Sequence, residues 1–508
     1  MRSIYLAALF CLACWSCSNF LQEYSQDQSY VRSYKDLDEL LIGETYMETD
    51  FGYEIGYFPY LQIMADETRE NVVTTWEQPD WDQLVKKYFG YVTWQYRAGY
   101  APGKLTTSAE DTYWNKVYKH INLANMILDE IDKQAAPMEE DRQAVARIRG
   151  EAYFLRAAYY FMMVNLYSQP YEAAKATEAL GVPLKTTHYI EDRIFPRALQ
   201  SEVYALILDD LEKAAANLTD IPRKSLYRAN ITAVRLLQSR VYLYMQNWEK
   251  AAEYAQLCLD LQSDLADMNA FNGNRGFVDR ESPEVIFSMG GNNVPQMLSG
   301  LFAGLSVSEG LQKMYQNGDL RKEYYITYVG GDHEVWDCNK YVLQGSTQNA
   351  NVSEIYVLRT AEAWLNLAEA EACMGGAHEE NARKALDELR KRRIMRNNWQ
   401  ATTLAGDALI QEIRNERRRE LCFEGHRWFD LRRYTVCEKV PFTGAIQNTY
   451  STLEDMYTIS TISTYELSAG DPSWTLQIPY EVLQYEELTP NPRNERAPIS
   501  VKNGNQIY

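Results

Sequence analysis

The stretch that decides the fold is residues 413–433, which read IRNERRRELCFEGHRWFDLRR. Three acidic residues recur at intervals of four, so a helix places them on one face; they are Glu416, Glu420 and Glu424. Arg417 and Arg419 lie three residues from Glu420 and Glu416, the spacing at which opposite charges pair across a helix. We interpret the mixed charges as a partly buried ion-pair network on an amphipathic helix, in preference to a catalytic or anion-binding cluster.

Helical periodicity also fills much of the chain before this stretch. Apolar residues recur with a 3.6-residue period in seven segments, which are 114–131, 145–166, 201–218, 233–245, 248–261, 356–374 and 379–393. The last four form two pairs, each split by a two-residue turn, Gln246-Asn247 or Gly375-Gly376. Small residues such as Ala251 and Ala368 stand where paired helices must approach. We therefore predict tetratricopeptide-like (TPR-like) repeats, in preference to a generic helical bundle.

Three zones lack this helical pattern, at about residues 51–103, 263–350 and 435–508. The first has few helix signals and many aromatic residues, the second is rich in Gly, Asn and Asp, and the third in Pro, Thr and Ser. The helical parts lie between them, at about 110–262 and 353–434. The predicted fold class is mainly α, with a TPR-like helical repeat scaffold and a loop-rich region of short strands. We expect residues 17–508 to form a single fold. Binding sites favour loops held on a rigid scaffold, so these zones are the first places to search.

The N-terminus carries a secretion signal. Arg2 precedes an apolar run, Ile4 to Trp15, that is too short to span a bilayer. Cys17 follows this run directly, so we predict a lipoprotein signal peptide over residues 1–16 and acylation of Cys17, with palmitate-type chains as a stable anchor. Cys14 is the rival acylation site, and ordinary secretion with cleavage nearby is the alternative.

Composition and charge exclude several classes of function. The net charge of −19 opposes nucleic-acid binding, which requires basic surface. The five cysteines after Cys17 show no CxxC spacing, and the five histidines form no metal-binding motif, so we predict neither a metal site nor a cofactor. No nucleophile elbow or P-loop is present. Asp66-Glu67 is a tempting acid pair, but adjacent side chains point apart. We predict that the chain is not an enzyme and has no catalytic residues.

Several segments carry a family resemblance. Residues 413–433 resemble the signature helix RxERRxELxFEGxRxxDLRR of the SusD/RagB family, residues 357–370 its LRxAEaxLnxAEA helix, and residues 150–157 its GEAxFLRA helix. Asp319-Leu320-Arg321 lies where members carry a D-x-R, and residues 17–21, CSNFL, resemble the start of many mature members. Ile478-Pro479 and Asn491-Pro492 echo the family's C-terminal tail, although the usual QNPGY ending is missing. These segments follow the family order over most of the chain.

The resemblance implies a lipid-anchored, surface-exposed protein of the cell outer membrane. Such a protein has TPR helices on one side and loops on the other. It covers a SusC-like TonB-dependent transporter and delivers a nutrient to it, an oligosaccharide or, in the RagB branch, a peptide.

The candidate ligand-binding residues come from aromatic content. The chain has 38 Tyr, 11 Trp and 15 Phe, and sugar rings stack on aromatic faces while their hydroxyls pair with polar side chains. The aromatic candidates are Trp76, Trp81, Trp94, Tyr96, Tyr100, Tyr315, Tyr325 and Trp336, with Asn71, Gln78 and Arg97 as polar contacts. A glycan-binding subunit predicts exposed aromatics in a shallow cleft on the loop side, and a RagB-like subunit predicts a deeper groove for peptides. A TPR adaptor without a small ligand is the third hypothesis.

Overall fold

The computed structural model describes residues 31–47, 57–71, 88–99, 112–292, 294–298, 305–330, 335–342, 350–455 and 458–504. In these residues helices dominate, as the predicted fold class requires. The long helices are α5 (Thr112–Glu130), α6 (Glu139–Tyr167), α7 (Gln200–Leu218), α8 (Ile231–Tyr244), α9 (Trp248–Leu261), α13 (Thr360–Met374), α14 (Glu379–Arg390), α15 (Gly406–Glu420) and α16 (His426–Thr435). The shorter ones are α2 (Tyr34–Leu40), α4 (Phe89–Val92), α10 (Val294–Met297), α11 (Glu309–Gln312), α12 (Arg321–Tyr324) and α17 (Tyr480–Glu486).

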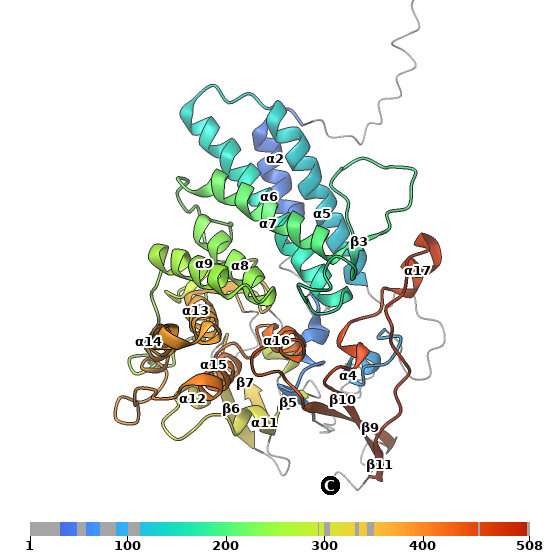
Figure 1. Cartoon of the computed structure of the whole chain (residues 1–508), viewed down its shortest axis with the longest axis vertical. Helices are drawn as coiled ribbons and strands as arrows, with labels where there is room; N and C mark the ends of the chain where they lie inside the picture. Colours follow the sequence, from blue (N-terminus) through green and yellow to red (C-terminus); the bar gives the residue numbers. More distant parts are fainter. Residues whose placement is uncertain are drawn as a thin grey trace, which may run out of the picture.

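The long helices stack in sequence order down one side of the molecule (Figure 1). The α8–α9 pair and the α13–α14 pair are neighbours in this stack, because α9 packs against α13 although about a hundred residues separate them in the chain. The turn between α8 and α9 has a local cause. Gln246 adopts φ +58°, and the Asn247 side chain caps α9 by accepting the Lys250 backbone N–H. Gly375 and Gly376 supply positive φ for the turn after α13.

Most strands lie in the loop-rich zones, whereas β2, β3 and β8 lie within the parts predicted to be helical, and all form small antiparallel sheets. A three-stranded sheet has the order β11 (Ser500–Asn503), β10 (Thr458–Ser468), β9 (Ala445–Asp455). The two-stranded sheets pair β1 (Thr68–Glu70) with β5 (Leu305–Val307), β2 (Leu180–Pro183) with β3 (Arg197–Leu199), β4 (Val285–Ser288) with β8 (Val357–Arg359), and β6 (Ile326–Gly330) with β7 (Val335–Cys338). In Figure 1, β5, β6, β7, β9, β10 and β11 lie along the lower edge, away from the helices α5, α6 and α7.

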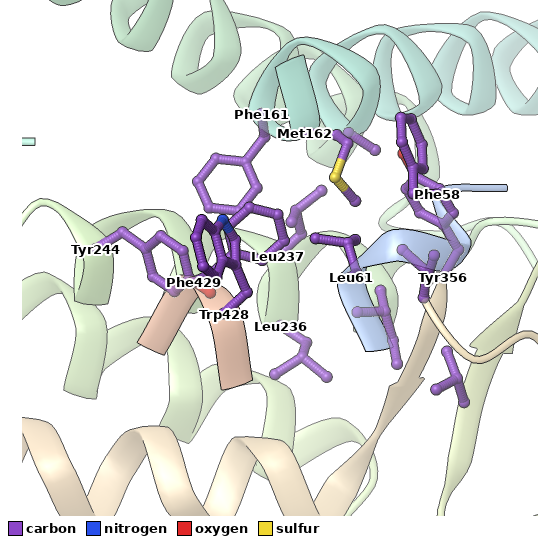
Figure 2. Packing of buried hydrophobic residues seen from close by; sticks show 14 of the residues in the cluster. Phe58, Leu61, Phe161, Met162, Leu236, Leu237, Tyr244, Tyr356, Trp428 and Phe429 are labelled. Carbon is purple, nitrogen blue, oxygen red and sulfur yellow. The ribbon is translucent and has the colours of Figure 1, made fainter. Parts of the chain in front are cut away.

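One continuous core joins the helical repeats to the loop-rich part. In Figure 2, Phe161 and Met162 of α6 face Leu237 and Tyr244 of α8, with Trp428 and Phe429 of α16 beside them. Phe58, Leu61 and Tyr356 approach from the irregular segments. All of these side chains are at least nine-tenths buried. Burial of apolar surface from both parts supports a single fold over residues 31–504, as far as the structure describes them.

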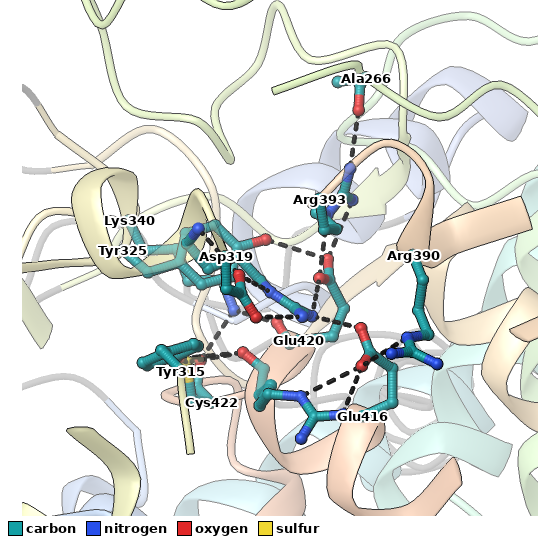
Figure 3. A network of polar contacts seen from close by, with 12 residues as sticks. Ala266, Tyr315, Asp319, Tyr325, Lys340, Arg390, Arg393, Glu416, Glu420 and Cys422 are labelled. Atoms are coloured by element: carbon teal, nitrogen blue, oxygen red, sulfur yellow. Dashed lines mark hydrogen bonds and ion pairs between the residues drawn. The ribbon is translucent and has the colours of Figure 1, made fainter. Parts of the chain in front are cut away.

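The core also contains a buried ion-pair network centred on Glu420 (Figure 3). The Glu420 carboxylate accepts hydrogen bonds from Arg393 at 2.9 Å, Arg359 at 2.7 Å and Arg321 at 3.0 Å, and all four side chains are fully buried. Burial opposes ionisation of Glu420, but the three guanidinium groups outweigh it and hold the pKa well below the usual range. The network therefore joins α15 to α12, to the end of β8 and to the segment after α14.

The structure corrects two details of the predicted signature helix. The helix ends at Glu420, before the predicted face residue Glu424, because Phe423 (φ +62°) and Gly425 (φ +70°) turn the chain into α16. Glu424 therefore lies outside the helix, where it accepts from Arg359 and Lys340. Arg419 pairs with Glu416 as predicted, at 2.6 Å, whereas Arg417 pairs with Asp430 of α16 at 2.8 Å and not with Glu420.

A further boundary differs from the prediction. Residues 357–359, predicted to begin a helix, form β8 and pair with β4 before α13 starts at Thr360. In the part of the chain that the structure describes, no helix has the length and apolar content needed to cross a membrane.

We expect Glu420→Gln to destabilise the fold by about 3–5 kcal/mol, because it removes the shared partner of three buried arginines. Urea and thermal denaturation would measure the loss. Glu388→Gln on α14, which breaks only half-exposed pairs with Lys391 and Arg392, is the matched control and should cost less than about 1 kcal/mol. Equal effects from the two substitutions would contradict the central role of Glu420.

Candidate ligand-binding cleft

A polar cleft with a volume of about 710 Å³ opens on the loop-rich side of the molecule. Its lining comes from five separate parts of the chain. They are β1 with the segment before it, the end of α4, β5 with the start of α11, α15, and the β9–β10 hairpin. The polar and charged lining side chains are Asp66, Thr68, Arg69, Glu70, Ser308, Glu309, Arg418, Gln447, Asn448, Thr449 and Thr464. Ile63, Val92 and Leu305 complete the lining together with Gly310. A cleft of this size and polarity can hold a hydroxyl-rich ligand of several units.

One wall of the cleft is the β1–β5 pair. Thr68 pairs with Val307 and Glu70 with Leu305 in an antiparallel register. Ser308 then fixes the wall to the segment before β1, because its hydroxyl donates to the Asp66 carbonyl at 2.7 Å and its backbone N–H donates to the Glu67 carbonyl at 2.8 Å. This wall is therefore held by backbone hydrogen bonds and is preformed.

The opposite wall is the polar face of the β9–β10 hairpin. Thr449 and Thr464 are cross-strand partners, as are Gln447 and Glu466, and alternation along a strand puts these four side chains on one face. The other face of the hairpin carries the buried side chains Ile446, Tyr450, Tyr465 and Leu467, and there Phe89 of α4 stacks edge-to-face on Tyr450 with ring centroids 4.7 Å apart. Packing of this face thus directs the polar face into the cleft.

Glu70 joins the two walls. Its carboxylate accepts the Ser451 backbone N–H at 3.1 Å and the Ser451 hydroxyl at 2.7 Å. Burial raises the pKa of Glu70 to about 7, against an ordinary value of 4.5. Glu70 therefore exchanges a proton near neutral pH at the edge of the cleft.

The base of the cleft is an Arg–Asp–Arg cluster. Asp66 accepts two hydrogen bonds from Arg427, at 2.7 and 2.9 Å, and pairs with Arg418 at 3.0 Å. Burial opposes the charge of Asp66, but the two guanidinium groups lower its pKa to about 2. The neighbouring Glu67 points away from Asp66 and accepts the Phe423 backbone N–H at 3.2 Å. Asp66 lines the cleft, whereas Glu67 is buried and does not, so the two adjacent carboxylates point to different surroundings.

A pair of aromatic side chains lies on the β6–β7 hairpin, next to the β5 wall. Tyr328 and Trp336 are cross-strand partners with ring centroids 5.6 Å apart. Tyr328 is 51% exposed and Trp336 is half-buried. The hairpin is tied to β5, because the Trp336 backbone N–H donates to the Ser306 hydroxyl at 2.9 Å. This aromatic pair offers a stacking surface on the same side of the molecule as the cleft.

Three of the predicted aromatic residues belong to the core instead. Trp94 is fully buried and donates its indole N–H to the Met64 carbonyl at 3.0 Å. Tyr315 donates its hydroxyl to the Arg419 carbonyl at 3.1 Å, and Tyr325 donates to Glu420 at 2.9 Å. The polar tip of each ring is thus satisfied inside the protein, and no face is open to a ligand.

The remaining predicted residues have different placements. Trp336 is in the aromatic pair, Tyr96 is half-buried, and Asn71 is buried at the end of β1. Arg97 stacks on the Tyr480 ring at 4.4 Å and does not line the cleft. Trp76, Gln78, Trp81 and Tyr100 lie outside the described residues, as do Cys14 and Cys17. Asn71 is the last described residue of the segment that contains β1, and it precedes Trp76 by five residues in the sequence.

Sequence reasoning missed most of the cleft residues. Thr68, Glu70, Gln447 and Thr464 are common polar residues in short strands, and no motif marks them. Tyr328 could have been found from the sequence. It follows Ile326 by two residues in a strand-like pattern, and the strand that pairs with it carries another aromatic residue, Trp336.

A possible cation site elsewhere is already neutralised. Asp129, Glu130 and His188 bring ligand-type atoms within 4.8 Å of one another. The Lys133 ammonium group lies 2.8 Å from both Asp129 and Glu130 and supplies the counter-charge. This cluster is therefore an exposed ion-pair group.

Comparison with known families agrees with this architecture. A family model described as "SusD family" matches residues 298–492, and another described as "Starch-binding associating with outer membrane" matches residues 60–243. Together they include residues from both walls and the base of the cleft. The chain belongs to the SusD/RagB family. A SusD-like protein of Formosa agariphila is 23% identical, over 86% of this chain and 90% of its own length, and a second from the same organism is 25% identical over 65% and 72%.

Solved structures of SusD proteins share the fold. A SusD superfamily protein of Bacteroides thetaiotaomicron superposes with a TM-score of 0.70 at 21% identity, covering 91% of this chain and 100% of that protein. A laminarin-binding SusD-like protein superposes with a TM-score of 0.65 at 21% identity, covering 91% and 100%. A SusD-like carbohydrate-binding protein of Bacteroides vulgatus gives 0.62 at 20% identity, covering 92% and 93%. These structures establish the SusD fold for this chain.

We expect the stability of this SusD fold to fall as the pH rises from about 4.5 to about 7, and Glu67 to contribute part of the slope. Burial raises the pKa of Glu67 to about 7, so folding takes up a proton in this window. The contribution is present below pH 4.5 and declines by about 1.4 kcal/mol per pH unit up to pH 7. Glu67→Gln should remove it, which urea denaturation at several pH values would measure. Glu249→Gln, at an exposed position, should leave the slope unchanged.

Proposed function

We propose that this SusD-family chain binds an oligosaccharide at the cell surface and delivers it to a SusC-like TonB-dependent transporter, without catalysing a reaction. The observation that carries the proposal is the polar cleft beside an exposed aromatic pair, both on the loop-rich side. Sugar recognition needs both kinds of surface, because hydroxyl groups exchange hydrogen bonds and the C–H faces of the rings stack on aromatic side chains.

The cleft residues fit the polar part of this recognition. Hydroxyl groups of Thr449 and Thr464 both donate and accept, whereas those of Thr68 and Ser308 already donate to backbone carbonyls and keep only acceptor capacity. The Gln447 amide and the Glu70 carboxyl add planar hydrogen-bonding groups. The walls are fixed by backbone pairing, so little ordering entropy is lost on binding. The described lining includes no aromatic side chain, and the stacking faces would come from Tyr328 and Trp336, with Trp76, Trp81, Tyr96 and Tyr100 as further candidates.

The family supplies the setting of the proposal. One matching family model is described as associating with the outer membrane, and one structural neighbour as laminarin-binding. In line with the first description, we propose an outer-membrane location, and we further propose an anchor at Cys17 and delivery to a transporter. A RagB-like role in peptide uptake is the alternative.

The test is calorimetry on the soluble chain, truncated after Cys17, with laminari-, malto- and other oligosaccharides and with a mixed peptide pool. Saturable binding to one glycan class supports the proposal. Binding to peptides and to no glycan would move the protein to the RagB-like alternative, and binding to neither would contradict both readings for the isolated chain.

For the bound glycan, we expect Trp336→Ala and Tyr328→Ala each to weaken affinity by about 5–30-fold, the equivalent of about 1–2 kcal/mol of lost stacking. Calorimetry with the same glycan would measure this. Tyr189→Ala is the matched control, because Tyr189 is 57% exposed but lies on the loop that packs against α5. Unchanged affinity in both hairpin variants would rule out the aromatic pair as part of the site.

A further inference from the structure

A second polar recess, with a volume of about 160 Å³, opens on the other side of α15 from the cleft. Arg418 lines the cleft, whereas the next residue, Arg419, lines the recess together with Glu412 and Glu416. The helix therefore separates the two. One water needs roughly 10–15 Å³ of such space, so the recess has room for a ring-sized ligand.

The recess is built between two loops that are clamped together. The Met395 backbone N–H donates to the Gly318 carbonyl at 2.8 Å, and Asp319 forms a β-bridge with Ile394. Gly318 has φ +86°, and a Cβ there would lie 2.6 Å from Cγ of Asn398. Only glycine allows the two loops to approach this closely.

Four amide side chains form the mouth of the recess, and they come from both loops: Gln316, Asn317, Asn398 and Gln400. All four are exposed, and each amide both donates and accepts hydrogen bonds. The mouth therefore suits a ligand whose polar groups also both donate and accept hydrogen bonds.

The carboxylates that line the recess already form ion pairs. Asp319 accepts from Arg321 at 2.8 Å, and Glu412 accepts from Arg419 at 2.6 Å. Glu416 accepts from both Arg321 and Arg419, each at 2.6 Å. Every carboxylate that lines the recess thus has an arginine partner, so a charged ligand would meet no unbalanced charge.

One buried N–H group in the lining of the recess has no acceptor within the described residues. Arg390 lines the recess, and its Nε is 3.9 Å from Glu416, too far for a hydrogen bond (Figure 3). Trp399 is not part of the lining, but it stands between the lining residues Asn398 and Gln400 in the chain, and its indole N–H also lacks an acceptor among the described residues. Leaving a buried donor unsatisfied is unfavourable, so an acceptor bound beside Arg390 would be stabilised.

We propose that this recess is a second saccharide subsite, which takes one uncharged sugar unit. Sugar hydroxyls can accept from the Arg390 Nε donor and exchange hydrogen bonds with the four amides at the mouth. The neighbouring Trp399 indole N–H would report such binding. The inference does not depend on the cleft, because the recess is lined by different residues and lies across α15 from it.

The test uses the Trp399 indole N–H as a reporter in NMR spectra of the soluble chain with ¹⁵N-labelled tryptophan. The Trp399→Phe variant assigns the signal, and neutral di- and trisaccharides are the probes. We expect a saturable shift of this signal, weakened at least tenfold in the double variant Asn398→Ala/Gln400→Ala. Gln411→Ala, an exposed amide on α15 outside the recess, should leave the titration unchanged.

The cleft variants separate this inference from the proposed function. The Trp399 shift should persist in Glu70→Gln and Trp336→Ala, whose own binding loss is measured by calorimetry. Absence of a saturable shift with every probe, or its persistence in the double variant, would overturn the subsite while leaving the cleft proposal intact. Loss of the shift in Glu70→Gln would also overturn the proposed subsite, because the Trp399 signal would then report binding in the cleft. Both recess substitutions are at exposed positions, and thermal denaturation would verify that the variants are folded.

Discussion

The carboxylate of Glu420 holds three arginines from three different elements, and the relative positions of those elements depend on it. Arg321, Arg359 and Arg393 come from α12, β8 and the segment after α14, and each is fully buried. Taking these charges out of water is costly, so the network is weak evidence for high stability. Its effect is on specificity, since any other arrangement of these elements would leave a buried charge without a partner. The loop-rich zone at about residues 263–350, which contains Arg321, is thereby fixed to the helical repeats.

The three consecutive arginines of α15 form ion pairs on different sides of the helix. Arg417 pairs with Asp430 of α16, Arg418 reaches Asp66 at the base of the cleft, and Arg419 pairs with Glu412 and Glu416 beside the recess. Successive residues on a helix point about 100° apart, so one short run can contact three surroundings. The motif is structural, as its sequence indicated, yet through Arg418 and Arg419 it also shapes both polar hollows of the loop-rich side.

The sequence predicted the helices well because their apolar period is long and regular, and it predicted that charges in residues 413–433 would pair. It could not predict most of the partners. The Arg419–Glu416 pair is local and was correct, whereas the partners of Arg417 and Glu420 come from other elements that only the tertiary fold brings near. The same limit applies to the site. Trp94, Tyr315 and Tyr325 look like ligand aromatics by type, but buried backbone and carboxylate acceptors satisfy their polar tips. The cleft is assembled from five distant segments, most of its polar residues are ordinary Thr, Ser, Gln and Glu residues, and no local pattern marks them.

The separation of polar and aromatic surfaces bears on how a carrier of this kind would work. In the described residues, the cleft offers hydrogen-bonding groups without aromatic rings, and the aromatic pair stands on a neighbouring hairpin. Each surface alone would bind a sugar weakly, because exposed stacking contributes about 1 kcal/mol and hydrogen bonds replace those already made to water. A glycan long enough to contact both surfaces would bind more tightly, because its second contact is intramolecular. Short oligosaccharides would then dissociate quickly and long chains would be retained, which is what the proposed capture of a glycan and its delivery to a transporter would require.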